Sequence, residues 1–99
     1  MAIQKKIVTG NLELLVSGRI DGAVANELEV EILNGIRSDM SNIYVNLAEA
    51  DFLCSAGIRV LLQYYRQMTT QKKQLRVCHP SGVVKAALEM TGFHDLIEP

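Results

Sequence analysis

Apolar and polar residues along this sequence recur with two periods, one typical of β-strands and the other of α-helices. Segment 12–17 largely alternates apolar with polar residues, and segment 3–8 precedes it across a turn at residues 9–11. Two short strands around a glycine-containing turn are typical of a β-hairpin. Short apolar runs at 43–47 and 74–78 indicate two further strands, the first of them buried.

Three other segments carry apolar residues at helical spacing, and each begins near a residue that can cap a helix. Asp21, Ser55 and Ser81 have side-chain oxygens that can accept an unpaired amide hydrogen of a first helical turn. Gly92 is expected to end the third helix, and Gly35 to fray the end of the first. The apolar stripes of the three helices are Ala25, Leu28, Ile32 and Ile36; Ile58, Leu61, Leu62, Tyr65 and Met68; and Val84, Ala87 and Leu88.

These elements follow one another as strand-strand-helix-strand-helix-strand-helix. This alternation predicts an α/β fold with a mixed four- to five-stranded sheet, helices packed on it and right-handed crossovers. Ninety-nine residues are enough for one core, so we expect a single domain over residues 1–99. In open sheets of this kind, functional residues follow the carboxyl ends of strands. Connectors 18–22 and 51–57 are therefore expected to lie side by side.

Composition argues against several classes of protein. The chain is 48% hydrophobic and 21% charged, as in an ordinary globular domain, and its net charge of −1 argues against nucleic-acid binding. No run approaches about 18 consecutive apolar residues and no signal peptide is visible, so we expect a cytoplasmic protein without membrane insertion. Cys54 and Cys78 do not make a disulfide framework. His79 and His94 lack partners at metal-ligand spacing, and we expect neither metal nor cofactor.

Ser55 is the sharpest candidate for a functional residue, because it lies where the strand at 43–47 and its connector give way to the central helix. Its plain role is that of a helix N-cap. A helix start also carries partial positive charge and free N–H groups, so it tolerates an added anion. The Ser55 hydroxyl is therefore suited either to capping or to carrying a phosphate that changes recognition without unfolding the domain.

Residues 54–59, Cys-Ser-Ala-Gly-Ile-Arg, suggest a rival function, that of a cysteine phosphatase. In such enzymes a thiolate attacks phosphorus and an arginine clamps the phosphoryl oxygens. Their loops have one residue more than the four that separate Cys54 from Arg59. A triad of Ser55 with a histidine and an aspartate also stays open, although the G-x-S-x-G motif is missing.

Four local patterns occur in order along the chain. Val16 to Asp21 ends a strand with Gly-x-apolar-Asp, Ile43 to Leu47 is an apolar strand ending in Asn-Leu, and Phe52 to Gly57 precedes an apolar helix. The fourth pattern comprises Leu75, Arg76, Val77, Val84, Leu88 and Gly92. In this order and spacing the patterns resemble the STAS domain over nearly the whole chain, and most closely the stand-alone bacterial anti-sigma factor antagonists.

This resemblance implies a regulated binding protein and not an enzyme. In that family the unphosphorylated protein binds an anti-sigma factor that is also a serine kinase, and a sigma factor is thereby released for transcription. The kinase phosphorylates a loop serine, which corresponds to Ser55 here, and the complex weakens until a serine phosphatase resets it. The resemblance therefore implies phosphorylation at Ser55 and an anti-sigma factor/serine kinase as the partner, with no direct contact to nucleic acid.

Two residues depart from the family's loop, which normally reads Asp-Ser-Ser-Gly or Asp-Ser-Thr-Gly. Cys54 replaces the Asp and Ala56 the second hydroxyl residue, so a negative charge beside Ser55 is lost. This departure keeps a second function open, that of a STAS subunit that only docks, as a scaffold in a stress-signalling complex or a lipid transporter. Arg59 is expected to pair with a partner carboxylate or with a phosphate on Ser55. The predicted partner-binding residues are Asp21, Asp51, Cys54, Ala56, Gly57 and Arg59.

Overall fold

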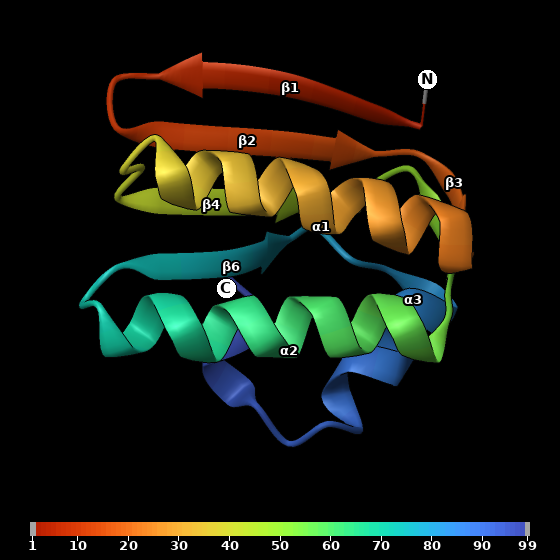
Figure 1. Ribbon diagram of the computed structural model, residues 1–99. Coiled ribbons are helices and arrows are strands. Elements are labelled where there is room, and N and C mark those ends of the chain that lie inside the picture. Colours follow the sequence, from red (N-terminus) through yellow and green to blue (C-terminus); the bar gives the residue numbers. More distant parts are fainter. Residues whose placement is uncertain (1, 99) are drawn as a thin grey trace.

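The computed structural model describes residues 2–98 and contains a four-stranded sheet in the order β1-β2-β4-β6 and a two-stranded sheet of β3 and β5 (Figure 1). Strands β2, β4 and β6 run parallel, and β1 pairs with β2 in an antiparallel hairpin. The predicted α/β fold with a mixed sheet is confirmed. In chain order the elements are β1 (Ile3–Val8), β2 (Asn11–Val16), β3 (Gly18–Ile20), α1 (Gly22–Arg37), β4 (Asn42–Asn46), β5 (Ala50–Leu53), α2 (Ser55–Thr70), β6 (Gln74–Cys78), α3 (Gly82–Glu89) and the 3-10 turn η1 (His94–Leu96).

Helices α1 and α2 lie side by side over one face of the four-stranded sheet (Figure 1). The Tyr64 hydroxyl on α2 donates a hydrogen bond of 2.7 Å to the Glu29 carboxylate on α1 and so ties the two helices together. Because strand residues alternate between faces, the opposite face carries polar pairs such as the Asn42 amide donating to Asn11 over 2.8 Å. The core residues contributed by the parallel strands β2, β4 and β6 are Leu12, Leu14, Val16, Ile43, Val45, Leu75 and Val77.

Of the two predictions for the ends of α1, the cap at Asp21 is confirmed and the fraying at Gly35 is wrong. Gly35 lies inside α1 and is buried, so the prediction that it frays the helix is wrong. A Cβ at Gly35 would lie 2.6 Å from Leu12 Cδ2 and 3.0 Å from Ile43 Cδ1, so the missing side chain lets α1 approach the sheet. The predicted cap at Asp21 is confirmed, because its carboxylate accepts a 3.0 Å hydrogen bond from the Val24 N–H.

The end of the described chain packs beside β6. Val77 bridges to Ile97, and the Glu98 N–H donates to the Val77 carbonyl over 2.8 Å. Ser81 occupies the N-cap position of α3 as predicted, although its side chain makes no capping hydrogen bond within residues 2–98. No helix in this part of the chain is both long and apolar enough to cross a membrane.

Candidate functional site

Strands β3 and β5 bring two distant segments of the chain together at one end of the molecule. Their parallel register places Arg19 opposite Phe52 and Ile20 opposite Leu53. The Cys54 N–H then donates to the Ile20 carbonyl over 3.0 Å. The expectation that connectors 18–22 and 51–57 lie side by side is therefore confirmed. Neither strand was predicted, because segments of three and four residues are too short to show a period.

Ser55 is the first residue of α2 and not its N-cap, so the predicted capping role is wrong by one position. Cys54 is the N-cap, with extended dihedral angles of φ −79° and ψ 168°, and its carbonyl accepts from the Ile58 N–H over 3.1 Å. The hydrogen bond from the Cys54 N–H to the Ile20 carbonyl keeps Cys54 extended, as the next residue after β5. The helix therefore begins one residue later, at Ser55. The Ser55 side chain is exposed and makes no hydrogen bond within the described residues.

The first turn of α2 offers uncompensated positive charge to this hydroxyl. Among the described residues, no acidic side chain lies in that turn and the Cys54 side chain makes no capping hydrogen bond. The first N–H groups of a helix lack intrahelical partners and carry the positive end of the helix dipole. A negative group on Ser55 would therefore face favourable charge.

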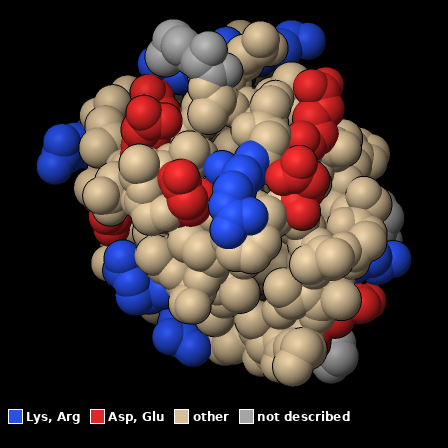
Figure 2. Space-filling model, turned by 90° about the vertical axis from the view of Figure 1, so that its right-hand side faces the viewer, with Lys and Arg blue, Asp and Glu red and all other residues tan. Residues whose placement is uncertain are grey.

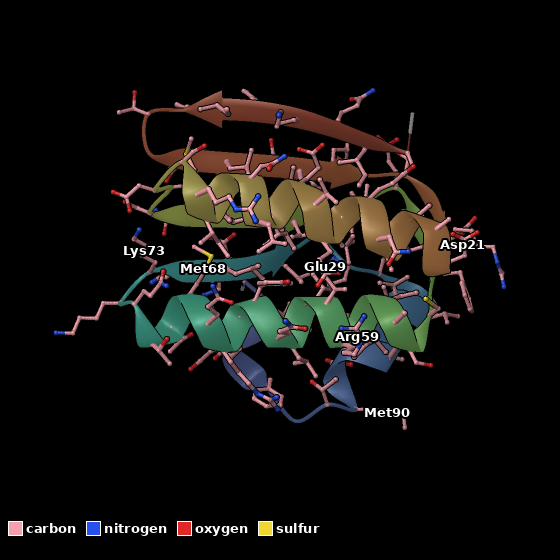
Figure 3. The ribbon with its side chains drawn as sticks, in the orientation of Figure 1. Asp21, Glu29, Arg59, Met68, Lys73 and Met90 are labelled. Carbon is pink, nitrogen blue, oxygen red and sulfur yellow. The ribbon has the colours of Figure 1, made fainter. Side chains whose placement is uncertain are left out.

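Three other predicted residues lie exposed at the same end of the molecule. Asp21 begins α1, Asp51 lies in β5 and Arg59 follows one turn after Ser55. Figure 3 places Asp21 at the right-hand end of α1 and Arg59 part-way along α2, in its right-hand half. The Arg59 guanidinium donates to the Gln63 side chain over 3.2 Å. We call the group of Asp21, Asp51, Cys54, Ser55 and Arg59 the Ser55 surface.

The two small residues of the loop pattern lie deeper. Gly57 is buried and Ala56 is half-buried. A Cβ at Gly57 would lie 2.6 Å from Leu53 Cδ1 and 3.3 Å from Ile20 Cγ2. Gly57 therefore allows the start of α2 to approach β3 and β5 closely, and this approach determines where Ser55 lies.

Arg19 and Phe52 form a further contact at this end of the molecule, and neither residue was predicted to belong to the site. The Arg19 guanidinium carbon lies 3.8 Å from the centre of the Phe52 ring, in a cation–π arrangement across the β3–β5 pair. Figure 2 looks onto this end of the molecule and shows basic side chains at its centre with acidic side chains on either side. Only the pairing of β3 with β5 reveals this contact, since the two residues are far apart in sequence.

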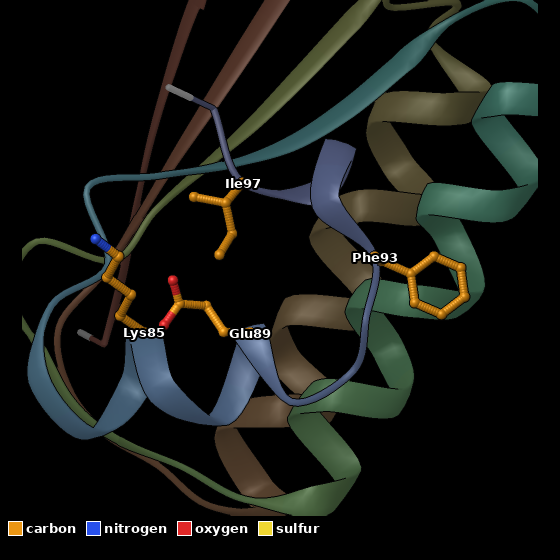
Figure 4. Close-up of a pocket in the computed structure, with 4 residues that line it drawn as sticks. All are labelled: Lys85, Glu89, Phe93 and Ile97. Atoms are coloured by element: carbon orange, nitrogen blue, oxygen red, sulfur yellow. The ribbon is translucent and has the colours of Figure 1, made fainter.

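A shallow depression extends from Ser55 along the outer face of α2. Its apolar part consists of Ile58 and Leu62, and its polar rim contains two arginines and a glutamine; the lining residues are Ser55, Ile58, Arg59, Leu62, Gln63 and Arg66. Another depression lies between α3 and the chain end and is lined by Lys85, Glu89, Phe93 and Ile97 (Figure 4). The second one contains none of the predicted residues, whereas the first one begins at Ser55.

Residues 54–59 do not form the loop of a cysteine phosphatase. Residues 55–58 are helical, so no loop lies between Cys54 and Arg59 to surround a phosphate. Within residues 2–98 no group of three or more His, Cys, Asp or Glu residues is placed to hold a metal ion. What the surface offers is an exposed hydroxyl, mixed charge and an apolar strip.

Comparison with known proteins matches residues 2–99 to the STAS domain. The anti-sigma-B factor antagonist of Staphylococcus aureus is 30% identical over 86 residues, which cover 86% of this chain and 79% of that protein. The unphosphorylated anti-sigma factor antagonist SpoIIAA superposes with a TM-score of 0.87 at 19% identity, covering 98% of this chain and 86% of SpoIIAA. Bacillus SpoIIAA in its phosphorylated form superposes with a TM-score of 0.82 at 17% identity, covering 98% of this chain and 89% of that protein. The chain belongs to the STAS domain family.

Proposed function

We propose that this protein is an anti-sigma factor antagonist that binds an anti-sigma factor/serine kinase through the Ser55 surface and is switched off by phosphorylation of Ser55. The single observation that carries the proposal is the exposed, unbonded Ser55 hydroxyl in the first turn of α2. The name of the S. aureus relative supports the class of partner. Existence of SpoIIAA in unphosphorylated and phosphorylated forms supports the modification as the switch.

The physical mechanism separates folding from recognition. Phosphorylation adds roughly −1.5 to −2 charges at pH 7. The start of α2 tolerates this charge, because the helix dipole and the free N–H groups of the first turn stabilise it. A partner that has buried the neutral hydroxyl must instead desolvate a dianion, and the complex weakens. A serine phosphatase restores the neutral hydroxyl and with it the binding-competent form.

Arg59 and the apolar strip of α2 give this interface its remaining chemistry. Ile58 and Leu62 are partly buried hydrophobic residues packed against the core, and their outer surface lines the depression next to Ser55. Arg59 lies on the rim, where it can pair with a carboxylate of the partner. Asp21 and Asp51 place negative charge at the edge of the same end. The surface therefore suits a partner with an apolar segment flanked by both signs of charge.

The decisive experiment compares the binding of the Ser55→Asp and Ser55→Ala variants to each purified anti-sigma factor that the same genome encodes. Ser55→Asp is expected to weaken binding at least about tenfold, since a desolvated charge costs more than about 1.4 kcal/mol, and Ser55→Ala is expected to retain it. Ser81→Asp is the matched control, because Ser81 is also exposed at a helix start and makes no capping bond within the described residues. Equal affinities of Ser55→Asp and Ser55→Ala would contradict the switch.

Cys54 favours a second candidate function, a STAS subunit that docks constitutively as a scaffold. The family's aspartate is absent at this position, so no carboxylate stands directly before Ser55. Intact-mass analysis of the protein from its native cell separates the two functions. A phosphate-sized addition that disappears in a Ser55→Ala strain supports the switch, and an unmodified protein under growth, stationary phase and stress supports the scaffold.

A further inference from the structure

The two edges of the four-stranded sheet are finished differently. At β6 the chain end covers the edge, through the bridge from Val77 to Ile97 and the hydrogen bond from the Glu98 N–H to the Val77 carbonyl. At β1 no described residue pairs with the outer side of the strand, which forms the upper border of the sheet in Figure 1. An unpaired edge presents a row of free N–H and C=O groups to any strand of matching register.

The register shows which backbone groups of β1 face outward. The Ser17 N–H donates to the Ala2 carbonyl over 2.8 Å, so even-numbered residues of this strand bond inward to β2. The odd-numbered residues Ile3, Lys5 and Ile7 therefore direct their N–H and C=O groups away from the sheet. Their Cα partners on β2 are the buried Val16, Leu14 and Leu12, which places the odd side chains on the face covered by the helices.

The sequence of this strand reads almost the same in both directions about Lys5. Apolar Ile3 and Ile7 lie two residues away on either side, and polar Gln4 and Lys6 lie one residue away. The next pair outward, Ala2 and Val8, is apolar again. A two-fold axis through Lys5 would thus place apolar residues opposite apolar ones and polar residues opposite polar ones. The two side chains of each facing pair would lie on the same face of the sheet.

From this pattern we propose that β1 pairs antiparallel with β1 of a second copy of this chain, centred on Lys5. Ile3 faces Ile7 of the second copy, Lys5 faces Lys5, and Ile7 faces Ile3. Each facing pair of outward residues exchanges two hydrogen bonds. The pairing joins the two sheets into one and covers Ile7 and Val8, which are each 56% exposed in the single chain.

Charge at the centre of the pairing is balanced by α1. Two lysines facing each other would disfavour the contact, and lysine on an edge strand is a common protection against pairing. Here Lys5 Nζ lies 3.5 Å from Glu31 Oε1 of α1, so each copy supplies a carboxylate for its own lysine. A small depression lies between β1 and α1 beside this ion pair, bordered by Lys5, Ile7 and Glu31.

The pairing is expected to be weak and closed. One six-residue strand buries less than the roughly 1,200 Å² of a stable interface, so self-association should appear toward near-millimolar concentration. Growth stops at two copies, because the β6 edge is covered in each. Since the strands run in opposite directions across the axis, the two Ser55 surfaces lie at opposite ends of the joined sheet. Dimerisation is then independent of the state of Ser55.

Hydrogen exchange of the native chain, followed by NMR from low micromolar to near-millimolar concentration, tests the pairing directly. The amides of Ile3, Lys5 and Ile7 are expected to gain protection with concentration, because they face outward in the single chain. The inward amides of Gln4 and Lys6 are the internal control and are expected to change little. A dimer that protects other amides, or no protection at any concentration, would overturn the proposal.

Sedimentation equilibrium of two variants gives the second test. Ile7→Pro removes an outward N–H that β2 does not use, and edge strands tolerate proline at such positions. Because the symmetric contact loses one hydrogen bond on each side, we expect self-association weakened about tenfold or more. Ile7→Thr keeps the N–H and the β-branched side chain and is expected to associate within about threefold of the native chain. Equal association of a folded Ile7→Pro protein would contradict the pairing.

Discussion

Cys54 occupies a position where a different side chain would strengthen the fold. It is the N-cap of α2, and within the described residues its side chain makes no capping hydrogen bond. Aspartate is among the preferred N-cap residues, because its carboxylate accepts from the N–H of the second or third helical residue. We therefore expect Cys54→Asp to raise the free energy of unfolding by about 0.5–2 kcal/mol at neutral pH, measured by urea denaturation. Cys54→Ala is the control and should change stability little.

The effect of Cys54→Asp should depend on pH in a defined direction. The new carboxylate is stabilised by the helix start, so its pKa falls below the unfolded value, and the stability gain is present above that value and lost on acidification. A gain that persists at a pH where the carboxylate is protonated would show that capping is not its cause. At this residue, helix capping and the family pattern favour the same side chain, aspartate.

Cys78 is expected to be an unreactive thiol. The pKa of Cys78 is raised from 9.0 to about 12, mainly because the thiol is buried. The hydrogen bond that its Sγ donates to Glu98 Oε2 over 2.9 Å and the nearby charges of Glu98 and Glu13 raise the pKa further. Thiolate is the reactive form. In a Cys54→Ala background, alkylation of the folded protein should be slow at pH 7 and rise about tenfold per pH unit without a plateau below about pH 12.

The same pKa shift predicts how stability depends on pH. Because the folded pKa of Cys78 lies above the unfolded one, its contribution to stability is complete below about pH 9 and is lost as pH rises toward 12. Cys78→Val should remove this part of the loss of stability at alkaline pH.

Glu98→Gln removes a charge that raises the pKa of the Cys78 thiol, so it should speed alkylation at pH 9. An unchanged rate would contradict the role of Glu98.

At the scale of elements, the start of α2 depends on its close approach to β3 and β5. Gly57→Ala would place a methyl group 2.6 Å from Leu53 Cδ1, so Leu53 or the helix must shift. We expect a loss of about 1–3 kcal/mol in the free energy of unfolding, because overpacking outweighs the better helix propensity of alanine. Gly22→Ala at the start of α1 is the matched control, since a Cβ there meets nothing within 4 Å, and it should be neutral or slightly stabilising.

Gly57→Ala should also disturb the Ser55 surface, and this effect separates packing from contact. Gly57 is buried, so an altered affinity for the partner would arise through the position of Ser55 and not through a lost contact. Amide chemical shifts of residues 54–56 should move in Gly57→Ala and stay in place in Gly22→Ala. Equal stability of the two variants in urea would show that α2 has room at this position.

Sequence pattern was sufficient for the long elements and failed for the short ones. The hairpin, the three helices and the strands at β4 and β6 each extend over enough residues to show a period. β3 and β5 do not, and they are the elements that assemble the Ser55 surface. The helix start was misplaced by one residue because it is set by a bond from Cys54 to Ile20. That bond joins residues 34 positions apart, so no local pattern contains it.

The same limit explains what was missed at the site. Arg19 and Phe52 meet only because β3 pairs with β5. Gly35 was expected to fray the end of α1, because its close approach to Leu12 is not visible in the local sequence. Asp21, by contrast, acts through the N–H of Val24, three residues away, and this role was readable from the sequence. The local role of Asp21 was therefore predicted, whereas the contacts of Arg19, Phe52 and Gly35 depend on the tertiary structure and were not.

For the whole molecule, the proposed switch requires that charge on Ser55 alter binding while leaving the fold intact. Ser55→Asp places a carboxylate in the first turn of α2, in which the described residues include no acidic side chain. Interaction with the helix dipole should stabilise the folded state by about 0.3–1 kcal/mol at low salt, seen as an unchanged or slightly raised Tm. High salt should reduce this gain by screening.

Comparison with Ser81→Asp then tests whether stability and recognition are separate properties of this molecule. Ser81 stands at the start of α3, outside the Ser55 surface, so its substitution should leave partner affinity unchanged while the melting temperature again stays level or rises. If Ser55→Asp lowered the Tm in proportion to the loss of binding, the loss would come from partial unfolding, and a surface-charge switch would be wrong. A folded Ser55→Asp protein that no longer binds, beside a Ser81→Asp protein that does, is the outcome that the geometry of α2 predicts.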